Sequence, residues 1–317
     1  MDKKIEILFE ERTFLSADGQ SKVHAYIWRP EGVAYQGIIQ LSHGMCEYVQ
    51  RYDAWARRFC AHGYIFCGND HLGHGHTAPD EDELGYTHPK NGAEYLIEDL
   101  HTMTAIMRAD YPDLPLVLYG HSMGSFAARA YLTRYGDALS AALISGTAGP
   151  DLPTGLGLTV TKMIQKMKGD HHRSKMLTAI AFGSYNNRFK EEQDSFSWLS
   201  KDQEVRDKYR ADPFCRFVFT TAGYHTMFTL LHTVSDKKWA NGVPKSLPLF
   251  LFAGDQDPVG GYGKGVRKIY DRLIAAGCEK AKLRLYTGGR HEMHWEPEQE
   301  TVFEDIIAFL KETIHEH

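Results

Sequence analysis

The sequence predicts an α/β fold in which helices flank a mostly parallel central sheet and a helical cap is inserted. Three observations lead to this prediction. Short apolar segments alternate with segments of helical periodicity, one apolar segment runs through Gly-His-Ser-Met-Gly into a helix, and the alternation is interrupted between residues 150 and 243. We therefore expect a core of residues 1–149 and 244–317, with residues 150–243 as the cap.

The regular part of the chain divides into strands and helices with clear ends. Residues 5–19 and 22–32 have the alternation and the glycine boundaries of a hairpin. Buried strands are expected in six apolar segments, at residues 36–44, 64–70, 115–120, 141–147, 247–255 and 281–289. Helices are expected in five segments, at residues 48–63, 91–115, 125–136, 263–277 and 300–314.

The insertion contains an apolar stripe at helical spacing, formed by Leu156, Val160, Met163 and Met167. Spacing alone favours a helix that packs on a core. The length and place of the insertion favour a cap over the carboxyl ends of the strands, where open α/β sheets bind ligands. Leu156, Val160 and Met163 are then candidate substrate-binding residues. Core packing is the commoner role of aromatic residues, but six are further candidates: Phe214, Phe217, Phe219, Tyr224, Phe228 and Trp295.

Composition and charge exclude several classes of protein. The 317 residues carry a formal net charge of −5, and no run of Lys or Arg offers a surface to nucleic acid. The five cysteines have no paired spacing, so neither a disulfide framework nor a CxxC metal site is expected. We find no signal-peptide pattern and no run of 18 apolar residues. We expect a cytoplasmic protein without stable membrane insertion, whose apolar cap makes at most weak contact with membrane surfaces.

The segment Gly120-His-Ser122-Met-Gly124 lies between an expected strand and an expected helix. That context is typical of a nucleophile elbow, a strained turn that projects the serine hydroxyl above the sheet. Glycine is needed on both sides because the strand and helix backbones pass too close for a Cβ atom. The helix after the serine also directs its free N–H groups at the reacting centre. Ser122 is therefore the predicted nucleophile.

A serine nucleophile needs a base, and the base needs a carboxylate to orient it, in the chain order Ser, acid, His. The acid is expected after the strand at residues 247–255, where Asp257 is favoured and Asp255 is expected to cap the turn. The base is expected after the last strand, where His291 is favoured and His294 is expected to be structural.

An oxyanion hole is the remaining requirement of this chemistry. One backbone N–H is expected from Met123, directly after the nucleophile. The other is expected from Met45, because Gly44 lets the loop after the strand at 36–44 turn inward. The alternative is a glycine-containing strand exit without a function.

Five blocks occur in the order "SHGMCEY", "NDHLGHGHT", "GHSMGS", "GDQDPV" and "GGRHEMHWE". Together they resemble the monoacylglycerol lipase and lysophospholipase branch of the α/β-hydrolases, which is grouped with the serine aminopeptidases. The resemblance implies the α/β-hydrolase fold, with Asp257 as acid and His291 as base. It also implies hydrolysis of a carboxylic ester, such as a monoacylglycerol or a lysophospholipid, without a metal or an organic cofactor.

The histidine-rich segment at residues 69–77 suggests a metal site, but His71, His74 and His76 match no standard helical zinc motif. His171 and His172 add nothing to that spacing. The resemblance implies that Asp70 and these histidines support the active-site loops instead. No metal is expected.

Three other functions fit parts of the sequence. A general short-chain carboxylesterase would use the same triad. A serine aminopeptidase would need cap carboxylates to hold the substrate amine, for which Glu191, Glu192 and Asp194 are candidates, although a run of charges is more often a solvated face. A non-catalytic ligand-binding protein could keep the fold, but such proteins usually lose a triad member and none is missing here.

Overall fold

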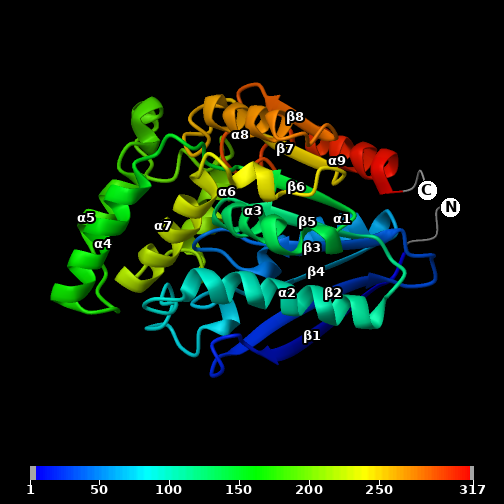
Figure 1. Cartoon of the computed structure of the whole chain (residues 1–317), viewed down its shortest axis with the longest axis horizontal. Helices are drawn as coiled ribbons and strands as arrows, with labels where there is room; N and C mark the ends of the chain where they lie inside the picture. The colour runs from blue at the N-terminus through cyan, green and yellow to red at the C-terminus, as the bar shows by residue number, and fades with distance from the viewer. Residues whose placement is uncertain (1–4, 315–317) are drawn as a thin grey trace.

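A computed structural model describes residues 5–314, and in this part of the chain it shows an eight-stranded sheet (Figure 1). The strand order is β1-β2-β4-β3-β5-β6-β7-β8. β1 and β2 form an antiparallel hairpin, β2 is antiparallel to β4, and all later pairs are parallel. The strands are β1 (Ile7–Leu15), β2 (Lys22–Pro30), β3 (Gly37–Ser42), β4 (Tyr64–Asn69), β5 (Leu116–His121), β6 (Ala141–Ser145), β7 (Leu249–Gly254) and β8 (Ala281–Tyr286). The expected fold class is confirmed.

Helices cover both faces of the sheet, and each face has its own apolar core. The helices α1 (Asp53–Ala61) and α9 (Gln299–Ile314) pack on one face through Trp55, Phe59 and Phe303. The helices α2 (Gly92–Asp110), α3 (Met123–Tyr135) and α8 (Lys264–Ala275) pack on the other. β5 serves both cores because its side chains alternate: Leu118 faces one and Tyr119 the other. This explains why the parallel strands read as continuous apolar runs.

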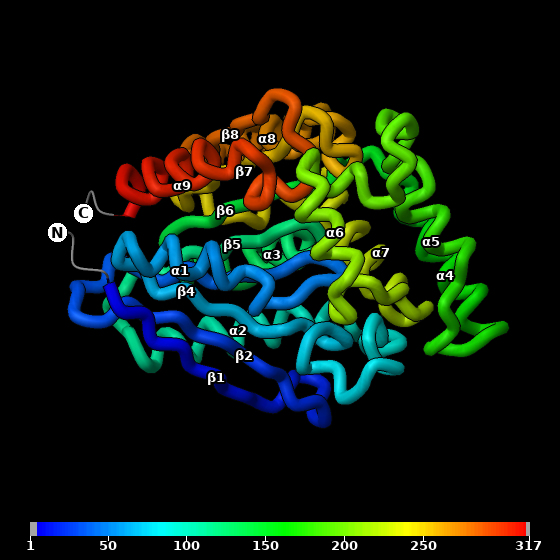
Figure 2. The backbone as a smooth tube through the Cα atoms, turned by 180° about the vertical axis from the view of Figure 1, so that it is seen from behind, coloured from blue at the N-terminus to red at the C-terminus, as the bar shows by residue number. Residues whose placement is uncertain are grey.

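Between β6 and β7 the chain leaves the sheet and forms α4 (Thr154–Lys168), α5 (Lys175–Phe182), α6 (Gln203–Ala211) and α7 (Thr221–Ser235). Figures 1 and 2 show α4 and α5 at one end of the molecule, with α7 between them and the sheet. The division at residues 150 and 243 stays a prediction, since α7 packs on the core helices α2 and α3 as well as on α4. Among the described residues, no helix combines the length and apolar character that a membrane span needs.

Of the apolar stripe expected on α4, Leu156, Met163 and Met167 face outward, whereas Val160 is partly buried against the core. The inward side of α4 consists of Thr154, Gly157, Thr161 and Ile164. Gly157 lets the ring of Phe228 on α7 approach to van der Waals distance, where a Cβ would lie 3.2 Å from ring atoms. Small residues together with Ile164 therefore make the helix contact, and the side chains of Leu156 and Met163 remain 64% and 54% exposed.

Candidate active site

Ser122 lies in the turn between β5 and α3, in a backbone conformation that non-glycine residues rarely adopt. Its φ is +51° and its ψ is −122°. The Ser122 amide donates to the Ser145 carbonyl on the neighbouring strand β6 (3.0 Å), which holds the turn. A Cβ at Gly120 would lie 2.6 Å from the Ala128 Cβ, and one at Gly124 would overlap the carbonyl oxygens of Ser42 and His43. Both glycines are therefore required by close backbone approach, as expected.

The structure brings Ser122, His291 and Asp257 into one hydrogen-bonded chain. His291 Nε2 lies 2.8 Å from Ser122 Oγ, and its Nδ1 lies 3.0 Å from Asp257 Oδ2. Asp257 is fully buried, and its other oxygen accepts a hydrogen bond from the Val259 amide (2.9 Å). Burial of His291 disfavours its charged form, but the Asp257 carboxylate outweighs this, so the pKa of His291 is raised. This arrangement is able to take a proton from the serine hydroxyl.

The neighbouring Asp255 and His294 are not part of this chain. Asp255 Oδ1 accepts a hydrogen bond from the Gly288 amide (2.8 Å). Asp255 was expected to cap the turn that directly follows β7. It instead stabilises the turn at Gly288 that leads to His291. His294 is buried and stacks on Tyr52, with 4.9 Å between ring centroids.

The two residues expected to supply the oxyanion donors line the same cavity as Ser122. Met45 and Met123 both line it, and among the described residues neither backbone N–H donates to a protein carbonyl. Gly44 allows the close approach of the Met45 loop, because a Cβ there would lie 3.0 Å from the Ser122 Cβ. Cys46 follows with a φ of +55°, so the loop turns sharply at this point.

Histidines of the 69–77 segment support this loop. His71 donates its amide to His43 Nε2 (3.0 Å), and its own Nε2 lies 3.1 Å from the His43 carbonyl. Asp70 accepts from the amides of Val49 (2.8 Å) and His76 (2.9 Å). Burial lowers the pKa of His71 to about 3, so its ring is neutral at physiological pH. These contacts match the supporting role that the family resemblance implied.

A charged network that the sequence reasoning missed joins the loop to the base. Arg51 donates to both carboxylate oxygens of Glu292 (2.7 and 2.8 Å) and to Glu47 (3.0 Å). Glu47 also accepts from the Gly44 amide, and burial raises its pKa to about 7. Glu47 lies in the segment "SHGMCEY" and Glu292 in "GGRHEMHWE". Both segments were singled out in the sequence, but no role was predicted for either glutamate.

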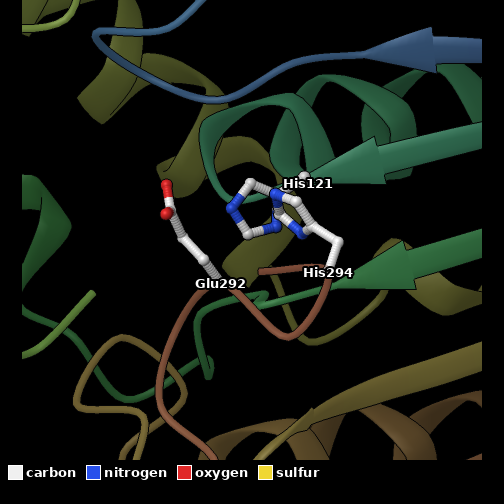
Figure 3. Close-up of side chains that lie close together, drawn as sticks. All are labelled: His121, Glu292 and His294. Atoms are coloured by element: carbon white, nitrogen blue, oxygen red, sulfur yellow. The ribbon is translucent and has the colours of Figure 1, made fainter. Parts of the chain in front are cut away.

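His121, Glu292 and His294 place their nitrogen and oxygen atoms within 4.8 Å of one another, all three being buried. Figure 3 shows the imidazole rings of His121 and His294 next to each other, with Glu292 beside them. Both oxygens of Glu292 are already bound by the Arg51 guanidinium. A metal ion would compete with that cation for the same carboxylate, which disfavours a metal site at this cluster.

A cavity of about 560 Å³ opens beside Ser122. Between β6 and β7, residues of α5, α6, α7 and the loops between them line it, and none of α4 does. Among them are Thr178, Ala179, Phe182, Tyr185, Trp198, Leu199, Tyr209, Phe217, Tyr224 and Met227. The expected candidates Leu156, Val160 and Met163 do not line the cavity. Two of the expected aromatics line it, Phe217 and Tyr224, and the remaining four do not: Phe214, Phe219, Phe228 and Trp295.

The cap carboxylates suggested for binding a substrate amine have other partners. Glu192 pairs with Arg290, and Asp194 pairs with Arg206 (2.9 Å) and Arg210 (2.6 Å). Neither these two nor Glu191 lines the cavity. These three candidate carboxylates are therefore not placed to hold a substrate amine in this cavity.

Comparisons with known proteins agree with this geometry. The profile of the serine aminopeptidase S33 family matches residues 34–298. A monoacylglycerol lipase of Mycolicibacterium smegmatis is 29% identical over 305 residues, covering 95% of this chain and 96% of the relative. The monoglyceride lipase of Homo sapiens is 29% identical over 309 residues, covering 94% and 89%. The crystal structure of a thermostable carboxyl esterase from Bacillus coagulans, in complex with glycerol, superimposes with a TM-score of 0.90 at 32% identity, covering 96% and 99%.

The family profile extends over most of the chain, including the insertion, and the relatives cover nearly all of it. The strand order, the turn at Ser122 and the buried acid and base are those expected of this fold. The chain therefore belongs to the serine aminopeptidase S33 family of α/β-hydrolases, in the branch that contains the monoacylglycerol lipases.

Proposed function

We propose that this protein is a serine hydrolase that cleaves carboxylic esters through an acyl-enzyme. The observation that carries the proposal is the continuous chain from Asp257 through His291 to Ser122, which ends at the wall of a cavity. That chain supplies a nucleophile, a general base and an orienting carboxylate within hydrogen-bonding distance.

In the proposed reaction Ser122 Oγ attacks the ester carbonyl while His291 Nε2 takes its proton. In the tetrahedral intermediate that forms, the negatively charged carbonyl oxygen accepts hydrogen bonds from the Met45 and Met123 amides. Collapse of this intermediate expels the alcohol, which receives the proton from His291 and leaves Ser122 acylated. A water molecule then attacks the acyl carbon while His291 takes its proton. That proton returns to Ser122 Oγ as the carboxylic acid is released. These steps use side chains, backbone amides and water.

The substrate we infer is a monoacylglycerol or a lysophospholipid. Its long acyl chain fits a cavity wall of apolar side chains, among them Phe126, Phe182, Met227 and Val259. Two relatives carry the name of monoacylglycerol or monoglyceride lipase. A general carboxylesterase is the second candidate, because the similar structure from Bacillus coagulans is a carboxyl esterase. An aminopeptidase is disfavoured, since the cap carboxylates are bound by arginines.

We further propose a cytoplasmic location and a weak contact of the cap with lipid surfaces. The free thiols of all five cysteines are buried, which suits a reducing compartment. On α4, the exposed Leu156, Met163 and Met167 lie near three exposed lysines, Lys162, Lys166 and Lys168. An apolar stripe flanked by lysines is the pattern of a helix that lies on an anionic membrane surface.

The test is hydrolysis of glyceryl and lysophosphatidyl esters of short to long acyl chains, compared between the wild type and Ser122→Ala. Activity that peaks at long chains and disappears in the variant supports a monoacyl lipid hydrolase. Activity confined to short esters replaces it by a general carboxylesterase. Cleavage of peptide amides without ester hydrolysis would overturn the proposal.

A further inference from the structure

The loop that carries His291 is held by the cap as well as by the core. The His291 amide donates to the Trp198 carbonyl (3.3 Å), and the Glu292 amide donates to the Leu199 carbonyl (2.8 Å). The backbones of residues 198–199 and 291–292 are therefore joined directly by two hydrogen bonds. The general base is attached to the insertion through its own backbone.

Side-chain hydrogen bonds and an ion pair also join the cap to the His291 loop. Arg290 donates from its guanidinium to the Ser197 carbonyl (2.6 Å) and pairs with Glu192. The buried Glu296 carboxylate accepts from the amides of both Arg290 (2.9 Å) and Lys201 (3.2 Å). A movement of the segment at 197–201 would therefore move the His291 loop.

The side chain of Trp198 extends the same connection to the imidazole itself. Its indole lies 5.0 Å from the His291 ring, centroid to centroid, at an interplanar angle of 42°. The Gly146 backbone is also close to the base, because a Cβ at Gly146 would lie only 3.0 Å from His291 Cε1. Trp198 and the Gly146 backbone both limit the rotation that would carry Nε2 away from Ser122.

Trp198 also belongs to the wall of the cavity. Its ring packs edge-on against Tyr185 (4.9 Å) and stacks with Phe182 (6.1 Å), and all three side chains line the space beside Ser122. Trp198 itself is only partly buried. A substrate chain that lies against these three rings would hold the indole in place, and the indole would hold the base.

We propose that Trp198 is a positioning residue that aligns His291 with Ser122 and couples this alignment to the occupancy of the cavity. The inference rests on the serine-hydrolase function proposed above. It assigns the cap a part in the chemical step, in addition to substrate binding. A misplacement of the base by about 1 Å is enough to reduce the rate of such a reaction by about 100-fold.

The experiment measures kcat and KM of Trp198→Ala on 4-nitrophenyl esters of short and long acyl chains. We expect kcat to fall about 10- to 100-fold, and to fall further on the long ester than on the short one, because only the long chain reaches the rings that hold the indole. Trp198→Phe, which keeps an aromatic ring, should recover kcat to within about threefold of the wild type. Phe182→Ala removes the adjacent wall without touching His291, and should mainly raise KM for the long ester.

Phe9→Ala is the matched control for loss of an aromatic ring. Phe9 is 43% exposed on β1 and packs on Tyr26 and Trp28, so its removal should leave kcat on the short ester unchanged. The rate of Ser122 labelling by a fluorophosphonate gives a second readout that needs no lipid. It should fall in Trp198→Ala in proportion to kcat, while thermal unfolding verifies that each variant is folded.

The outcomes separate this inference from the function on which it rests. Absence of labelling and of ester hydrolysis in the wild type overturns the serine-hydrolase proposal itself. If the wild type is active and Trp198→Ala changes only KM, then Trp198 only forms part of the cavity wall. That result overturns the positioning role. An equal loss of kcat in Trp198→Ala and Phe9→Ala also overturns it, because the effect would not be specific. If Trp198→Ala does not fold, the kcat of Trp198→Leu decides by the same criteria.

Discussion

Ser122 combines a strained backbone with a hydrogen-bonded side chain. Its positive φ costs on the order of 1–3 kcal/mol, which the surrounding strand and helix must offset. In this conformation Ser122 Oγ lies 2.8 Å from His291 Nε2. The adjacent Met123 amide donates to no backbone carbonyl of the described residues. The strained residue is thus the one that the proposed reaction uses.

His291 gives the first prediction at the scale of single residues, which concerns pH. Only the neutral imidazole is able to accept the serine proton, so activity must rise as the pH rises through the pKa of His291. Because that pKa is raised, the midpoint of kcat/KM should lie above the ordinary histidine value of 6.5. Asp257→Asn removes the carboxylate that raises it, so the midpoint should move to lower pH while kcat falls by about 10⁴-fold.

This prediction is checked by a pH–rate profile together with ¹⁵N NMR of the His291 ring. The NMR titration assigns the midpoint to His291 rather than to the nearby Glu47, whose pKa is about 7. A midpoint that Asp257→Asn leaves in place would show that Asp257 does not orient the base.

At the scale of elements, α3 connects the nucleophile to the insertion. Arg129 on α3 donates to the carbonyls of Ala148 (3.1 Å) and Val234 (2.6 Å), which lie near the two ends of the insertion. Its guanidinium also lies 4.5 Å from the ring of Trp239. Since α3 begins directly after Ser122, the same helix fixes the nucleophile and both ends of the cap.

The contact between α3 and the loop after β3 gives the second prediction. Gly124→Ala would place a Cβ against the carbonyl oxygens of Ser42 and His43 and displace the loop that carries Met45. We expect kcat to fall about 100- to 1,000-fold, the effect of losing one oxyanion donor, and the melting temperature to fall as well.

Gly155→Ala is the matched control for this substitution. Gly155 lies on α4 with no atom within 4 Å of an added Cβ, so alanine should stabilise the helix by up to about 1 kcal/mol and leave kcat unchanged. The comparison uses a short ester and thermal unfolding. Equal kcat for both alanine variants would mean that the loop tolerates displacement.

At the scale of the whole molecule, the sheet carries two separate apolar cores and the insertion covers only one end. α4 lies at that end of the molecule (Figures 1 and 2), and three of its large apolar residues, Leu156, Met163 and Met167, are exposed. We expect this outward apolar stripe to be an interaction surface.

The third prediction tests that surface with the triple substitution of Leu156, Met163 and Met167 to serine. Binding to vesicles of phosphatidylglycerol and phosphatidylcholine, measured by co-sedimentation, should weaken by at least about tenfold. Hydrolysis of a short soluble ester should not change. Serine substitution of Leu8, Phe9 and Leu15, which are exposed on the edge strand β1, is the control and should leave vesicle binding intact.

The sequence by itself determined the order of strands and helices, the strained turn at Ser122 and the identity of the acid and base that the structure brings together. These features are local, because each depends on a few adjacent residues. Examples are a glycine that a close backbone requires and a catalytic candidate that directly follows a strand. Their catalytic roles remain predictions.

Only the tertiary structure decided which side chains line the cavity and what holds the base. Leu156, Val160 and Met163 do not line the cavity, because α4 packs on Phe228 through Gly157, a residue that apolar periodicity does not single out. The Arg51–Glu292 pair joins residues 241 positions apart, and the Trp198–His291 contact joins the cap to the last loop. Such contacts depend on how elements distant in the chain pack together, and the spacing of residues along one segment contains no record of that packing.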